Sequence, residues 1–208
     1  MKTRMNSKQK TLRLVQLAML VALVVVLQLI SAIIPPIGGV SITLTLVPVV
    51  IGAILLGLKG GAILGFSFGL IVLVNCITGL DPGGNILWVA NPIFTAIICL
   101  VKGTAAGILP AYLYLLLMGK DKEAKAGKKY FSALVAALSA PVINTGLFVG
   151  GMFLFFTETL YAWAGGTDVM SYIIFGLAGL NFLVEFLINI ILTPAIVRIV
   201  DIVRRKMK

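Results

Sequence analysis

Histidine is absent from the 208-residue sequence, cysteine occurs twice, and only 12% of the residues are charged. Without histidine the chain has no Ser-His-Asp triad, no Cys-His nucleophile pair and no His-liganded zinc or haem. Cys76 and Cys99 lie in apolar stretches without C-x-x-C spacing, so we interpret them as small buried hydrophobic residues. A G-x-x-x-x-G-K-S/T phosphate loop and an acidic D-x-x-D cluster are also missing. The sequence therefore predicts no metal site, no cofactor site and no such ATP site in this chain.

Apolar residues are in excess and make up 60% of the chain. An ordinary soluble domain is about 45–50% apolar and about 25% charged. A soluble fold of this size could not bury that much apolar surface and still present a polar exterior. We therefore predict an all-α, polytopic protein of the cell membrane.

Six apolar stretches are long enough, or nearly so, for a helix of about 20 residues across the bilayer. They cover about residues 12–34, 43–58, 61–78, 92–118, 130–156 and 172–200. The first is too long for the apolar core of a signal peptide and has no small-residue cleavage site before Pro35, so we interpret it as a retained span. The sequence predicts six transmembrane helices, with residues 1–208 forming a single integral membrane domain.

Lysine and arginine alternate with the predicted spans. They occur before the first span, between the second and third, between the fourth and fifth, and at the C-terminus, whereas loops 35–42, 79–91 and 157–171 contain none. Basic loops stay on the cytoplasmic side, so both termini are predicted to be cytoplasmic. The formal net charge of +10 is thus interpreted as a topology signal and not as a nucleic-acid surface. Lys102 alone breaks the alternation.

Small residues recur at four-residue spacing, which allows helix backbones to approach closely in lipid. Gly61, Gly65 and Gly69 form such a ladder in the third span, extended backwards by Gly57, and are predicted to pack helices within the bundle. Ala18 and Ala22 form a second pair on the first span. Because alanine is common, this pair alone is a weak signal.

Polar side chains at membrane depth are costly and therefore informative. Lys102 lies about ten residues into the fourth span, roughly 15 Å deep at 1.5 Å per residue, and Glu185 lies at a similar depth in the sixth. Either the two neutralise each other, or they line an outward-facing cavity for a polar solute, in which a spare cation would select a carboxylate. The remaining predicted solute contacts are Asn75, Asn85, Asn91, Asn144, Asn181 and Trp88.

The predicted loop between the third and fourth spans is longer than a tight turn. It combines flexible Gly83 and Gly84 with Asn85 and Trp88. It could fold down as a lid over a solute, or Trp88 could anchor the helix ends at the interface.

The polar groups cluster from the midplane outward, as a closed-bottom pocket requires. A solute-binding membrane protein without an energy source suggests an energising partner. The alternatives are a homo-oligomeric facilitator or channel, which should show a polar stripe through the full depth, and an integral membrane enzyme, which should show a nucleophile with its base or a metal-binding acidic pair.

Residues 39–65 contain Pro48-Val49-Val50-Ile51-Gly52-Ala53 followed by a glycine run that ends in Gly61-Ala62-Ile63-Leu64-Gly65. This region resembles the second-to-third span region of the substrate-binding S components of energy-coupling factor (ECF) vitamin transporters, and the likeness extends over essentially the whole chain.

The resemblance implies a subunit that binds a vitamin or its precursor from outside. It would then join a transmembrane coupling subunit and two ATPase subunits, which use the ATP, and topple to release the ligand inside. In the family an alanine pair on the first span meets the coupling subunit, a role that would fall to Ala18 and Ala22.

Substrate identity rests on shorter segments. Residues 43–47 lack the acidic residue that riboflavin-type members carry before the proline of span two. The stretch 140–151, with Asn144-Thr145, is similar to a segment of pantothenate-type members. A carboxylate ligand would suit Lys102, with Asn144, Asn91 and Asn181 serving its hydroxyls and amide. The resemblance therefore implies pantothenate, with folate, hydroxymethylpyrimidine or a cobamide as alternatives.

Overall fold

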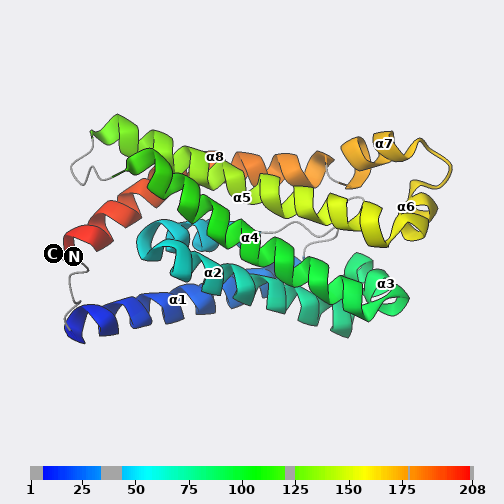
Figure 1. The fold of residues 1–208 in the computed structure, drawn as a ribbon, viewed down its shortest axis with the longest axis horizontal. Coiled ribbons are helices and arrows are strands. Elements are labelled where there is room, and N and C mark those ends of the chain that lie inside the picture. The colour runs from blue at the N-terminus through cyan, green and yellow to red at the C-terminus, as the bar shows by residue number, and fades with distance from the viewer. Residues whose placement is uncertain (1–6, 34–43, 120–124, 178, 207–208) are drawn as a thin grey trace.

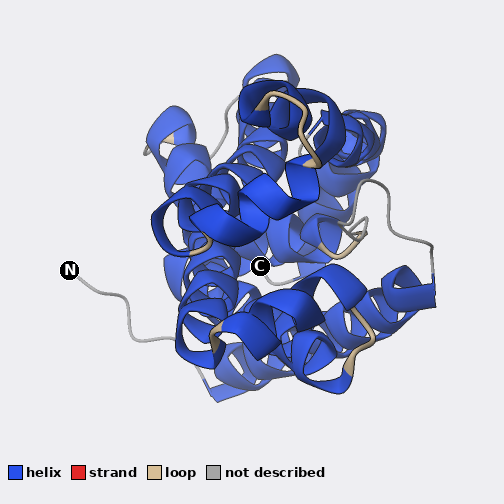
Figure 2. Cartoon of the chain, turned by 90° about the vertical axis from the view of Figure 1, so that its right-hand side faces the viewer, coloured by secondary structure: helices blue, strands red, loops and turns tan. Residues whose placement is uncertain are grey.

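The computed structural model describes residues 7–33, 44–119, 125–177 and 179–206. All regular structure in these ranges is helical, which confirms the all-α prediction (Figure 2). The long helices are α1 (Ser7–Ile33), α2 (Leu46–Thr78), α4 (Pro92–Met118), α5 (Ala126–Phe155) and α8 (Gly179–Lys206). Shorter elements are α3 (Pro82–Ala90), α6 (Thr157–Ala164), α7 (Val169–Ser171) and the π-helical turn η1 (Tyr172–Leu177).

The long helices run along one axis, and the short helices gather at one end of it (Figure 1). The start of α1, the end of α4, the start of α5 and the end of α8 lie at the opposite end, which we call the basic end. The end that carries α3, α6 and α7 is called the α3 end; its segments 79–91 and 156–171 contain no lysine or arginine. The chain thus gathers its basic segments at one end, as the charge alternation predicts.

The predicted second and third spans form one helical hairpin, α2, so the structure does not confirm six separate spans. Gly57 interrupts the helix with φ 73° and ψ −163°, a conformation that glycine adopts readily. A Cβ atom on Gly52 would overlap the Leu64 side chain, although a straight helix would place the two residues about 18 Å apart. The chain therefore folds back at Gly57, and Figure 1 shows the first arm running toward the basic end and the second arm away from it.

The first arm of α2, residues 46–56, is long enough to cross only about half of a bilayer. Its length is about 16 Å at 1.5 Å per residue, against a hydrocarbon core of about 30 Å. Among the described residues five helices are long and apolar enough to span a bilayer: α1, α2, α4, α5 and α8.

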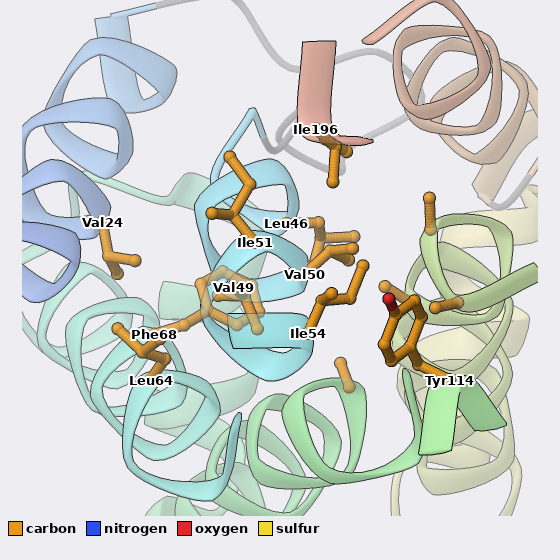
Figure 3. Packing of buried hydrophobic residues seen from close by; sticks show 14 of the residues in the cluster. Val24, Leu46, Val49, Val50, Ile51, Ile54, Leu64, Phe68, Tyr114 and Ile196 are labelled. Atoms are coloured by element: carbon orange, nitrogen blue, oxygen red, sulfur yellow. The ribbon is translucent and has the colours of Figure 1, made fainter. Parts of the chain in front are cut away.

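The core surrounds this first arm. Leu46, Val49, Val50, Ile51 and Ile54 of the arm are all buried, because the arm is apolar on every side and neighbouring helices enclose it. Figure 3 shows the enclosing side chains. They are Val24 of α1, Leu64 and Phe68 of the second arm, Tyr114 of α4 and Ile196 of α8.

The start of the first arm is held by side chains of α1. Ser31 Oγ accepts a hydrogen bond from the Leu44 backbone N–H at 3.3 Å, and Gln28 Oε1 accepts one from Thr45 Oγ1 at 2.8 Å. Pro48 has no N–H that would need a partner at the third helical position. The buried start of the arm thus has one N–H group fewer, and the Leu44 N–H and the Thr45 hydroxyl are both hydrogen-bonded.

The glycine ladder packs the second arm of α2 against α4. A Cβ atom on Gly61 or Gly65 would overlap the carbonyl oxygens of Gly107 and Gly103, and one on Gly69 would lie 2.5 Å from the Cys99 carbonyl oxygen. Gly61, Gly65 and Gly69 therefore have the packing role that their spacing predicts. Gly57 does not extend the ladder; it makes the turn of the hairpin.

Helix boundaries follow local signals at some ends and depart from expectation at others. The fourth span begins at Pro92 as predicted, because Asn91 caps α4 by accepting a hydrogen bond from the Phe94 backbone N–H at 3.2 Å. The predicted sixth span begins later, at Gly179, because residues 172–177 form the separate turn η1. The predicted loop 35–42 lies outside the described residues.

Candidate functional site

A cavity of about 50 Å³ lies in the half of the bundle toward the α3 end, between α1, the second arm of α2, α3, α4, α5 and α6. It is large enough for a few water molecules. Its polar and aromatic lining residues are Gln28, Asp81, Thr95, Lys102, Phe148 and Trp163. The cavity brings together side chains that are far apart in the sequence.

Lys102 lies in this cavity, as the outward-facing pocket interpretation expects. Its Nζ atom lies 4.8 Å from the centroid of the Phe148 ring. The negative face of an aromatic ring attracts a cation at this distance. Lys102 is the only basic residue among the described residues that line the cavity, and Asp81 is the only acidic one. A carboxylate entering from the α3 end would meet the ammonium group in a largely apolar wall.

Glu185 occupies a different position. It is buried in α8, with 3% of its surface exposed, and does not belong to the described lining of the cavity. Its backbone carbonyl accepts a hydrogen bond of 2.8 Å from Asn189 Nδ2. The structure therefore assigns Lys102 to the cavity and Glu185 to a polar stripe on α8.

The predicted asparagines are divided between helix ends and the bundle interior. Asn85 Nδ2 donates a hydrogen bond of 2.8 Å to the Cys76 carbonyl and ties α3 to the end of α2. Asn91 caps α4, and Asn75 is buried in α2. Asn144 is buried in α5, one turn inward of Phe148. The side chain of Asn181 lies outside the described part of the chain.

The predicted loop over the solute is helix α3. Pro82 lies in its first turn, which suits a helix start, and Gly83 and Gly84 line the cavity. A Cβ atom on Gly84 would overlap the Cys76 sulfur, so glycine allows α3 to approach α2 closely. Trp88 is half-buried and packs against the core.

Sequence analysis did not predict most of the polar and aromatic lining residues as solute contacts: Gln28, Asp81, Thr95, Phe148 and Trp163. Gln28 carried a signal, because an uncharged amide inside the most apolar span is a costly group. Phe148 and Trp163 are apolar residues in apolar surroundings, and only their neighbours in space distinguish them. Cys76 and Cys99 are buried free thiols, as predicted, and they also line the cavity.

Comparisons with known proteins agree with the resemblance seen in the sequence. Residues 12–197 match the family described as "ECF transporter, substrate-specific component". The chain is also 30% identical over 200 residues to the pantothenic acid transporter PanT of Lactococcus lactis subsp. cremoris, which covers 91% of this chain and 94% of that protein. Components of this family are transport subunits, which sets aside the alternative of an integral membrane enzyme. This chain belongs to the substrate-specific components of ECF transporters.

Proposed function

We propose that the chain is the substrate-binding subunit of an ECF importer for pantothenate. The observation that carries the proposal is Lys102, a cation held at membrane depth in a cavity otherwise lined mainly by apolar and uncharged groups. Pantothenate carries a carboxylate for this ammonium group and hydroxyl and amide groups for the neighbouring polar side chains. The relationship to PanT of L. lactis supports the same ligand.

In this proposal the α3 end faces outward and the basic end faces the cytoplasm. The support is the positive-inside rule, because lysine and arginine gather at the basic end. The ligand would then enter past α3 and α6. Ligand pockets usually measure about 300–1,000 Å³, whereas this cavity measures about 50 Å³. Binding therefore requires α3, or the α6 segment that carries Trp163, to move outward.

The direct test is ligand binding by the purified chain in detergent or nanodiscs. We expect isothermal titration calorimetry to detect pantothenate binding, and mass spectrometry to find pantothenate in the co-purifying small molecules. Folate, hydroxymethylpyrimidine and a cobamide serve as competitors. Binding of one of these with no measurable pantothenate binding would reassign the substrate.

The proposal includes a transmembrane coupling subunit and two ATPase subunits as partners, with ATP hydrolysed by the ATPases. Ala18 and Ala22 are both exposed on α1, four residues apart on one helix face. A small-residue face of this kind allows close approach of a partner helix. The family relationship, the four-residue spacing and the exposure of both alanines support this contact.

The contact on α1 gives a prediction of its own. Ala18→Trp and Ala22→Trp should each lower pantothenate uptake by membrane vesicles that contain all the subunits at least tenfold, because the indole ring blocks close helix packing. Ligand binding by the purified variants should stay within twofold. Leu23→Trp, at an exposed position that directly follows Ala22 and therefore does not share its helix face, is the matched control. Normal uptake by both alanine variants would contradict the proposed surface.

A further inference from the structure

A stripe of polar residues runs along the buried face of α8. Glu185, Asn189 and Thr193 follow one another at four-residue spacing, with 3%, 1% and 0% of their surfaces exposed. Asn189 Nδ2 donates to the Glu185 carbonyl at 2.8 Å, and Thr193 Oγ1 donates to the Asn189 carbonyl at 2.7 Å. The stripe therefore faces the protein interior, where polar groups are retained only at a cost.

Asn144 of α5 lies at the same depth as this stripe. The two helices are antiparallel and adjacent (Figure 1), and Lys129 Nζ lies 3.5 Å from Asp201 Oδ1. Fifteen residues onward from Lys129 is Asn144, and fifteen residues back from Asp201 is Phe186, the neighbour of Glu185. Since both helices rise by 1.5 Å per residue, Asn144 and Glu185 lie at about one level.

Two buried amide oxygens, one at this level and one about a turn deeper on α8, lack hydrogen-bond donors. Oδ1 of Asn144 and Oδ1 of Asn189 are buried and have no hydrogen-bond partner within the described part of the chain. Asn144 is 7% exposed. Buried acceptors are nearly always paired in proteins, so each unpaired one requires an explanation. A ligand that brings O–H or N–H groups would provide the missing donors.

Along α5, Asn144 lies inward of the cavity. Phe148, which lines the cavity and contacts Lys102, is one helical turn outward of Asn144. Asn189 lies one turn further inward along α8 than Glu185. One turn of helix is about 5.4 Å. From the α3 end, a ligand would thus meet the ammonium group first and the two amide oxygens about one to two turns deeper.

We propose that Asn144 and Asn189 form a second subsite of the ligand site, which accepts hydrogen bonds from hydroxyl or amide N–H groups of a ligand whose carboxylate is held by Lys102. This inference rests on the proposed function and narrows the substrate class to a carboxylic acid with hydrogen-bond donors at its other end. The subsite rejects acids that lack such donors, because these leave two buried acceptors unpaired.

The test compares two ligands on the purified chain. The first is pantothenate, and the second is an analogue in which hydrogen replaces both hydroxyl groups. Asn189→Leu, a change of similar size, should weaken pantothenate binding at least about tenfold, the equivalent of about 1.4 kcal/mol. The same change should leave the affinity for the analogue within twofold. Asn144→Leu should give the same pattern and serves as the second variant if Asn189→Leu does not fold.

Two controls separate recognition from structure. Thr193→Val, on the same face of α8 one turn further inward, should change the affinity for neither ligand by more than twofold. Lys102→Met should weaken both ligands equally, because both carry the carboxylate. Equal losses for the two ligands with the asparagine variants, or no loss, would overturn the subsite. A parent chain that binds no pantothenate would instead overturn the proposed function.

Discussion

We expect the Lys102→Met protein to bind pantothenate at least about a hundredfold more weakly than the parent chain. Removing one partner of a buried charge pair at a binding interface costs about 2–5 kcal/mol, and each 1.4 kcal/mol is about tenfold in affinity. Lys102 is the only basic residue among the described lining of the cavity, so no other described cation there can replace it. Methionine keeps an unbranched stem against the Phe148 ring and removes only the charge.

Calorimetry with the purified protein measures this effect, and Lys59→Met is its control. Lys59 is exposed and follows the Gly57 turn at the basic end, so its loss should leave the affinity within twofold. An uncharged alcohol analogue of pantothenate should bind the parent weakly and be insensitive to Lys102→Met. Undiminished pantothenate affinity in the Lys102→Met protein would remove this residue from the site.

The second large effect is expected at Gly65, where valine should destabilise the fold. A Cβ atom at this position would overlap the Gly103 carbonyl oxygen and lie 3.0 Å from the Gly107 nitrogen. Both are backbone atoms of α4, which cannot move aside as a side chain can. Overpacking costs typically about 1–3 kcal/mol, and here the upper end applies. In a chain of this size about 3 kcal/mol lowers the melting temperature by about 6–12 °C.

The melting temperature of the detergent-solubilised protein checks this, with Gly146→Val as the matched control. A Cβ atom on Gly146 would meet no atom within 4 Å, and Gly146 is an exposed α5 glycine. Both variants replace a helical glycine with valine and change the backbone freedom of the chain equally. The difference between their melting temperatures therefore measures the packing effect. Equal melting temperatures for the two variants would show that α2 and α4 can separate without loss.

Sequence patterns were sufficient to predict the long helices, because a chain that crosses lipid can adopt few other backbone structures. The membrane requires apolar helices of known length, and the distribution of lysine and arginine assigns each connection to one end. The hairpin at Gly57 was beyond this reasoning. Residues 43–58 have the composition of a span, and only contacts such as that between Gly52 and Leu64 distinguish a half-crossing arm from a full one.

Sequence reasoning selected candidate site residues where a charge or an amide lies at membrane depth. Depth and polarity identified Lys102, which lines the cavity, and Asn144, which is buried one helical turn inward of Phe148. The same signal was present for Gln28 and for Asn189. Sequence reasoning could not place Phe148 or Trp163 in the lining of the cavity, because their positions there depend on how α5 and α6 pack near α4. It also could not foresee that Asn85 fastens α3 to Cys76.

The half-crossing arm of α2 constrains the order in which the chain enters the bilayer. The arm begins at about mid-membrane, and unsatisfied backbone N–H groups there cost several kcal/mol each in lipid. Ser31 and Gln28 of α1 hold the start of the arm. Because α1 is mostly apolar from Leu14 onward and only lightly covered by the rest of the protein, it can be integrated first and alone. The arm can follow only once α1 is in place, so biogenesis of this fold should proceed from its N-terminal helix.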